Sequence, residues 1–132
     1  MTAVHDFDAV DQRLRAILDP LRPRLSVSKD GPEGLVLEVP GLEGKPWGYF
    51  AGVRRGQRYV SYYLMSVYAS PELVTSMSPE LRRRMQGKSC FNFTSVDEPL
   101  FDELARITET SYEPFVAMAS AVANDRSKAR GA

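Results

Sequence analysis

Two aromatic-rich runs, residues 47–53 and 59–64, constrain the fold more than any other feature of the sequence. They flank Arg54-Arg55-Gly56-Gln57, in which Gly56 can supply the positive φ that a tight hairpin needs. The two runs are therefore predicted to be paired antiparallel strands. Since side chains alternate along a strand, one face should carry Trp47, Tyr49, Ala51 and Val53 in the first run, and Tyr59, Ser61 and Tyr63 in the second.

Further elements precede this hairpin. Apolar residues at steps of three and four predict an amphipathic helix over residues 7–21, which Pro20 and Pro23 end. Residues 25–28 and 35–39 are predicted to be two strands joined by a turn that contains Gly and Pro. Glu38 alternates with apolar neighbours in the second of these strands, and we expect its carboxylate to face water.

Two short helices are predicted after the hairpin. Ser70-Pro71-Glu72-Leu73 and Ser78-Pro79-Glu80-Leu81 share one helix-start pattern, a serine N-cap followed by proline. The second of these helices should run to Gln86 and end at Gly87, because glycine is common at that position.

Another strand and a long helix complete the chain. Residues 89–94 are predicted to be extended, with Phe91 and Phe93 on one face and Cys90 and Asn92 on the other. An amphipathic helix follows, and Pro114 marks the place where it would break. The order of elements predicts a single α+β domain over residues 1–123, with an antiparallel sheet of five to six strands, an N-terminal helix and a C-terminal helix packed on it. Residues 124–132 are expected to be a flexible tail.

Charge and cysteine content narrow the functional classes. The 132 residues include 17 basic and 17 acidic side chains, so no overall field draws the chain to nucleic acid or to a membrane. The single cysteine allows no internal disulfide. No signal peptide and no membrane-spanning run is expected, and the predicted location is the cytoplasm.

Several short strings form a recognisable series within residues 45–115. Gly44-Lys45-Pro46 leads into Tyr49-Phe50-Ala51, and Gly87-Lys88-Ser89 opens the strand with the two phenylalanines. In this order of elements the chain resembles the YdhG-like family of domains of unknown function. The resemblance implies a small antiparallel sheet with helices on one side, similar in outline to frataxin-like or TATA-binding-like domains. It implies no established activity, although some relatives are labelled iron chaperones by analogy of shape.

The residues give little support for a catalytic nucleophile or for a metal site. His5 is the only histidine, and a dyad with Cys90 would need the N-terminus to be held beside the strand. One histidine and one cysteine cannot build a zinc site, so no metal and no cofactor is predicted. Acidic groups at two helix starts could form a carboxylate surface for iron, but acids are expected at helix starts as caps. These groups are Asp6, Asp8 and Asp11 at the first helix, and Asp97, Glu98, Asp102 and Glu103 at the last.

Positive charge offers the best remaining candidate site. Arg54, Arg55 and Arg58 lie at the hairpin turn, and Arg82, Arg83, Arg84 and Lys88 surround the end of a predicted helix. If the two groups converge beside tyrosines, they would form an anion site with stacking platforms. The candidate ligand-binding residues are Trp47, Tyr49, Arg58, Tyr63, Lys88 and Asn92.

These residues favour a non-enzymatic binding module for a small anionic ligand or a protein partner. One alternative is a homodimeric structural or interaction protein, in which the first strand pair joins a second copy. A carboxylate-based enzyme and an iron chaperone are further alternatives. Membrane and nucleic-acid partners are not expected.

Overall fold

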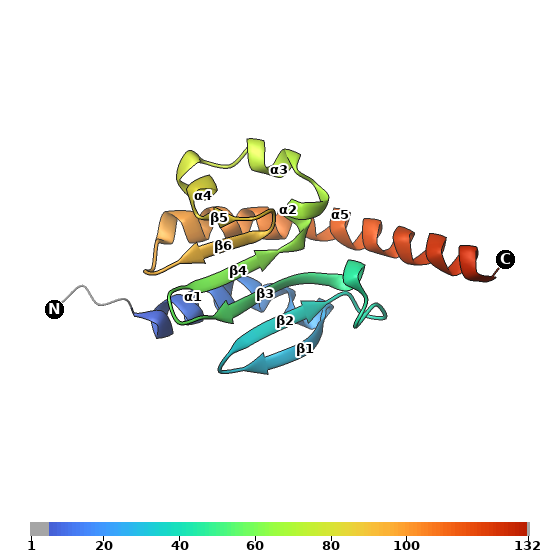
Figure 1. The fold of residues 1–132 in the computed structure, drawn as a ribbon, viewed down its shortest axis with the longest axis horizontal. Coiled ribbons are helices and arrows are strands. Elements are labelled where there is room, and N and C mark those ends of the chain that lie inside the picture. Colours follow the sequence, from blue (N-terminus) through green and yellow to red (C-terminus); the bar gives the residue numbers. More distant parts are fainter. Residues whose placement is uncertain (1–5, 132) are drawn as a thin grey trace.

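The structure is a computed structural model that describes residues 6–131, with side chains described for residues 6–125 (Figure 1). Its elements, in chain order, are α1 (Phe7–Leu18), η1 (Asp19–Arg24), β1 (Ser26–Gly31), β2 (Gly34–Glu38), η2 (Pro46–Gly48), β3 (Tyr49–Arg55), β4 (Val60–Leu64), α2 (Met65–Ala69), α3 (Glu72–Thr75), α4 (Pro79–Arg83), β5 (Met85–Gln86), β6 (Cys90–Phe93) and α5 (Glu98–Gly131).

The strands form one antiparallel sheet of six strands in the order β1-β2-β3-β4-β6-β5. Helices α1 and α5 lie together on one face of this sheet, and α5 continues past its end (Figure 1). The predicted single α+β domain with an N-terminal and a C-terminal helix on an antiparallel sheet is confirmed. None of the helices within residues 6–131 is long and apolar enough to span a membrane.

The core fills the space between the sheet and the two helices. Phe50 packs its ring 5.4 Å from Tyr112 and 5.4 Å from Phe115 of α5, measured between ring centroids. The hydroxyls of Tyr62 on β4 and Thr108 on α5 form a buried hydrogen bond of 2.6 Å. Helix α5 is therefore held to the middle of the sheet by ring contacts and by one polar bond.

A β-bulge corrects the predicted faces of the first aromatic strand. Tyr49 pairs with Glu38 and Ala51 pairs with Leu37, so the register shifts and Phe50 has no partner of its own. Phe50 and Ala51 are both buried, and the ring of Phe50 packs against α5. The prediction that Tyr49 shares a face with Ala51 and Val53 is wrong, because the extra residue turns Tyr49 to the opposite side of the sheet. In β4 the predicted alternation is confirmed.

Three other predictions differ from the structure. Helix α4 ends at Arg83 rather than at Gln86, since Met85 and Gln86 pair with β6 and Gly87 turns the chain with φ +81°. Pro114 lies inside a continuous α5 instead of breaking it. Helix α5 also includes residues 124–131 of the predicted tail, while residue 132 lies outside the described residues.

Candidate functional site

The face of the sheet away from α1 and α5 has no layer of helices over it in the described part of the chain (Figure 1). Strand register decides which side chains reach this open face. Tyr63 stands between Gly52 and Cys90, and Ser61 stands between Arg54 and Asn92 in the next row. The open face thus combines small, aromatic and polar residues, whereas the helix-covered face is apolar.

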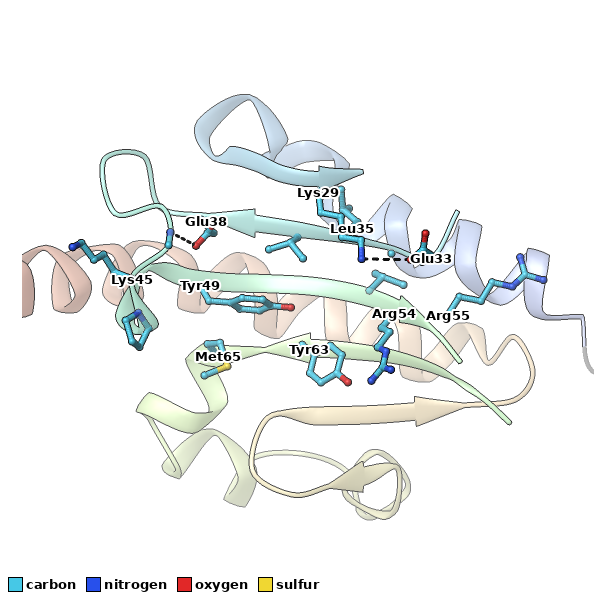
Figure 2. A pocket seen from close by; sticks show the side chains of 15 residues that line it. Lys29, Glu33, Leu35, Glu38, Lys45, Tyr49, Arg54, Arg55, Tyr63 and Met65 are labelled. Carbon is cyan, nitrogen blue, oxygen red and sulfur yellow. Dashed lines mark hydrogen bonds and ion pairs between the residues drawn. The ribbon is translucent and has the colours of Figure 1, made fainter. Parts of the chain in front are cut away.

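Two hollows lie side by side on the open face. The tyrosine hollow has a volume of about 880 Å³, and its lining includes Val36, Glu38, Tyr49 and Tyr63 (Figure 2). The hairpin hollow has a volume of about 570 Å³, and its lining includes Arg54, Arg58, Tyr59, Gln86 and Asn92. Arg54 and Tyr63 line both hollows, so the two form one continuous surface, here called the open-face trough.

Tyr49 forms part of the floor of the tyrosine hollow because Gly52 leaves room for it. Figure 2 shows the Tyr49 ring extending along β3, and its hydroxyl lies above Gly52. A Cβ at position 52 would overlap this hydroxyl and lie 2.6 Å from the carbonyl oxygen of Leu35. Burial, with a smaller effect from the neighbouring Tyr63, raises the pKa of Tyr49 to about 12. The phenol of Tyr49 therefore stays protonated and uncharged at neutral pH.

A hydrogen-bonded chain of polar side chains forms the floor of the hairpin hollow. The Ser61 hydroxyl donates to Oδ1 of Asn92 at 2.6 Å, and the Asn92 amide donates to Oε1 of Gln86 at 2.6 Å. The Cys90 thiol also donates to Oδ1 of Asn92 at 3.3 Å, and the Tyr59 hydroxyl approaches Oε1 of Gln86 at 3.5 Å. Both amide oxygens are thus occupied from within the protein, while the Gln86 amide nitrogen donates to no described residue.

The hairpin hollow is positively charged. Its lining includes Arg54 and Arg58 and no carboxylate, and neither arginine forms an ion pair within the described residues. The arginines that face carboxylates lie elsewhere: Arg55 pairs with Asp8, and Arg83 pairs with Glu80 at 3.6 Å. Within the described residues, the hairpin hollow therefore holds two cationic groups that no carboxylate pairs with.

Glu38 does not face water as the alternation of β2 predicted. Only 8 % of its surface is exposed, because its carboxylate accepts hydrogen bonds from the Ser28 hydroxyl and from the Gly44 backbone N–H, the latter at 2.9 Å. Glu38 closes one end of the tyrosine hollow and ties β1 to the loop before β3 (Figure 2). This position is structural, since both oxygens of the carboxylate are engaged.

The trough includes four of the six residues predicted to bind a ligand: Tyr49, Arg58, Tyr63 and Asn92. The other two lie outside it. Trp47 lines another, apolar hollow of about 470 Å³ beside α5, which adjoins the tyrosine hollow at Pro46, Tyr49 and Met65. The Lys88 ammonium lies 5.9 Å from the centre of the Tyr68 ring, and Tyr68 borders that apolar hollow.

The two predicted arginine groups do not converge. Arg82 and Arg83 are exposed on α4 and line neither hollow of the trough, and the Arg84 guanidinium lies 6.0 Å from the centre of the Phe93 ring. The hairpin group, through Arg54 and Arg58, meets Tyr59 and Tyr63 in the trough, whereas Lys88 of the helix-end group lies over the Tyr68 ring. The helix-end group cannot join it because α4 ends early and β5 follows, which leaves these arginines outside the open face.

The sequence prediction placed Arg54 in the hairpin arginine group but left it out of the six candidate residues, and it missed Gln86 and Ser61 altogether. Ser61 and Arg54 could have been found from strand alternation, since both share a face with Tyr63 once the pairing is known. Gln86 gave no such signal because it was assigned to the end of a helix. Its place at the floor depends on the two-residue strand β5.

The acidic groups considered for iron have other partners. Asp6 and Asp97 cap helices, Glu98 pairs with Arg13, and Glu103 accepts from the hydroxyl and N–H of Ser78. Within the described residues, no group of three or more histidine, cysteine or acidic side chains could hold a metal ion. The proposed partner of Cys90, His5, lies outside the described residues.

Comparisons of the chain with family models, with curated proteins and with solved structures gave no match. Functional inference therefore rests on the geometry and chemistry of the trough.

Proposed function

We propose that this protein is a non-enzymatic binding module that holds a small anionic ligand in the open-face trough. The observation that carries the proposal is that Arg54 and Arg58, which pair with no carboxylate in the described part of the chain, line a hollow that contains no acidic residue. Guanidinium groups bind oxyanions through charge-assisted hydrogen bonds, which are stronger than neutral ones. Adjacent tyrosine surface supplies the apolar contact that small-ligand sites normally combine with a few polar groups.

A binding role accounts for the site better than catalysis does. Among the groups lining the trough that could act as acid or base, Glu38 is engaged by two donors and the pKa of Tyr49 is raised to about 12. Glu33 is exposed and pairs with Lys29 at 3.8 Å. A general base near neutral pH needs a pKa close to the working pH, and the raised pKa of Tyr49 lies far above it. We also propose that the protein is related to the YdhG-like domains. We further propose that it lies in the cytoplasm, where free thiols are common.

Thermal unfolding in the presence of phosphate, sulfate and citrate tests the proposal. A ligand that binds only the folded state raises Tm with concentration, and replacing Arg54 or Arg58 by alanine should remove most of that rise. Phosphate and sulfate also stabilise proteins without binding to a site, so a matched control is needed. Arg83→Ala removes an exposed arginine outside the trough and should leave the rise in Tm unchanged. An equal rise in all three variants would contradict an anion site in the trough.

A homodimer is the second candidate, and β1 is the element that would form it. This strand lies at one edge of the sheet, and 43 % of the Val27 surface is exposed there. Exposed edge strands can pair with a second copy through their free backbone groups. Light scattering at high micromolar concentration measures the mass directly, and a single 14.8 kDa species would contradict this candidate.

A further inference from the structure

The hydrogen bonds in the floor of the trough narrow the class of anion that it can accept. The amide oxygens of Asn92 and Gln86 both accept hydrogen bonds from protein groups: Oδ1 of Asn92 accepts from Ser61, and Oε1 of Gln86 accepts from Asn92. What remains available to a ligand on this floor is the NH₂ group of Gln86 and the second N–H of Asn92. Together with Arg54 and Arg58, these groups present hydrogen-bond donors in the hairpin hollow.

A surface of donors with two unneutralised cations is matched by a group that only accepts hydrogen bonds and carries about two negative charges. A phosphoryl monoester is such a group, because it has three acceptor oxygens and a charge of about −1.5 to −2 at neutral pH. A carboxylate has one charge and two oxygens, so it can use only part of this arrangement. The hairpin hollow therefore fits a phosphoryl group better than a carboxylate.

The tyrosine hollow lies next to this position and suits a flat body. Gly52 has no side chain, so the Tyr49 ring can lie along the strand close to the backbone. Tyr63 lies directly across from Gly52 and borders both hollows, and its ring lies between Arg54 and Tyr49 (Figure 2). Rings stack on flat unsaturated groups at offset distances and add contact energy beyond simple burial.

We propose that the ligand is a small phosphomonoester with a flat, unsaturated ring, an inference that rests on the proposed function. Its phosphoryl group lies in the hairpin hollow, where Arg54, Arg58 and the Gln86 amide donate to its oxygens. Its ring lies over Tyr63 and the edge of Tyr49. The hollow volumes of about 880 and 570 Å³ are in the range of sites for small molecules.

An NMR titration of the intact chain with four simple probes tests this assignment. The probes are phenyl phosphate, glycerol 2-phosphate, inorganic phosphate and benzoate. We expect phenyl phosphate to bind about tenfold or more tightly than each of the other three, with shifts in the side-chain amide signals of Gln86 and Asn92. Gln86→Glu keeps the oxygen that accepts from Asn92 but replaces the NH₂ donor by a negative charge. This variant should lose phosphate binding while it remains folded.

The outcomes separate this inference from the function on which it rests. If the three phosphates bind equally and Arg54→Ala weakens all of them, the ring assignment is overturned and the anion site stands. If benzoate binds as tightly as phenyl phosphate, the phosphoryl assignment is overturned. If no probe shifts any signal of the trough, both the inference and the proposed function fail. Tyr63→Leu removes the aromatic ring but keeps an apolar side chain. This variant should bind phenyl phosphate about as weakly as it binds glycerol 2-phosphate.

Discussion

The buried bond between Tyr62 and Thr108 allows a quantitative test of how α5 is held to the sheet. Both residues are fully buried and their hydroxyl oxygens are 2.6 Å apart. Burial raises the pKa of Tyr62, so its hydroxyl keeps its proton and can act as a donor. In Thr108→Val the side chain keeps its shape, but the Tyr62 hydroxyl is left without a partner. We expect this change to lower the free energy of unfolding by about 2–3 kcal/mol, as for an orphaned buried polar group.

Removing the Tyr62 hydroxyl instead should lower the free energy of unfolding by a smaller amount. In Tyr62→Phe the remaining hydroxyl is that of Thr108, and threonine in a helix can donate to a carbonyl oxygen of the preceding turn. Loss of one net hydrogen bond then lowers the free energy of unfolding by about 1 kcal/mol. In the double variant both polar groups are absent and the shapes are nearly kept. Its cost should be about 1 kcal/mol or less, well below the sum of the two single changes.

Urea unfolding followed by circular dichroism measures all four free energies, provided that the dependence on urea is the same in each. The difference between the double variant and the sum of the single variants gives the coupling energy, which we expect to be about 2 kcal/mol. If the single costs add in the double variant within about 0.5 kcal/mol, the two hydroxyls are not coupled and this account of the contact is refuted. The matched control is a distant exposed threonine, Thr75→Val, whose effect should simply add.

Four further measurements test separate features. Gly52→Ala places a methyl group against the Tyr49 hydroxyl and the Leu35 carbonyl oxygen, and urea unfolding should show a loss of about 1–3 kcal/mol. Ser66 has a buried hydroxyl with no hydrogen-bond partner among the residues that the structure describes, so Ser66→Ala should raise the free energy of unfolding by about 1 kcal/mol. Pro114→Ala restores an N–H that can bond to the Thr110 carbonyl oxygen in α5, and Tm should rise, with a gain of up to about 3 kcal/mol. The pKa of Tyr49 is about 12 in the folded state and about 10 in the unfolded state, so the contribution of Tyr49 to the free energy of unfolding is fully present below pH 10. Between these two pH values the free energy of unfolding should fall by about 1.4 kcal/mol per pH unit. An equally steep fall in a Tyr49→Phe variant would contradict this.

Local sequence patterns predicted most of the fold because they depend on neighbours a few residues apart. The amphipathic stripe of α1 and the Ser78 cap of α4 appear where their residues indicated them. The turn between β1 and β2 is also present, but it is shorter than predicted because β1 continues to Gly31. The bulge at Phe50 could not be predicted in this way. It arises where Phe50 and Ala51 both pack on the helix-covered side, and that requirement depends on α5, which lies far along the chain.

The difference between local patterns and distant contacts also explains why only part of the candidate site was predicted. Tyr63 and Asn92 follow simple alternation within their own strands, and both reach the open face as expected. The predicted convergence of the two arginine groups depended on segments that are distant in the chain, and the hairpin group alone lines the trough beside Tyr59 and Tyr63. Tyr49 was chosen as a ligand-binding residue although its predicted face was wrong. Its presence in the trough depends on the bulge rather than on the pattern that led to its choice.

The neighbouring residues Tyr62 and Tyr63 show how one strand produces both the stable core and the candidate site. Tyr62 points toward α5, where it is fully buried and bonded to Thr108. Tyr63 points to the open face, where the small residues Gly52 and Cys90 beside it leave its ring accessible in the trough. A shift of one residue in the pairing of β4 would exchange these two environments. The buried bond of Tyr62 therefore helps to fix the register that presents Tyr63, so its loss should affect ligand binding only through loosening of the strand and not through a contact with the ligand.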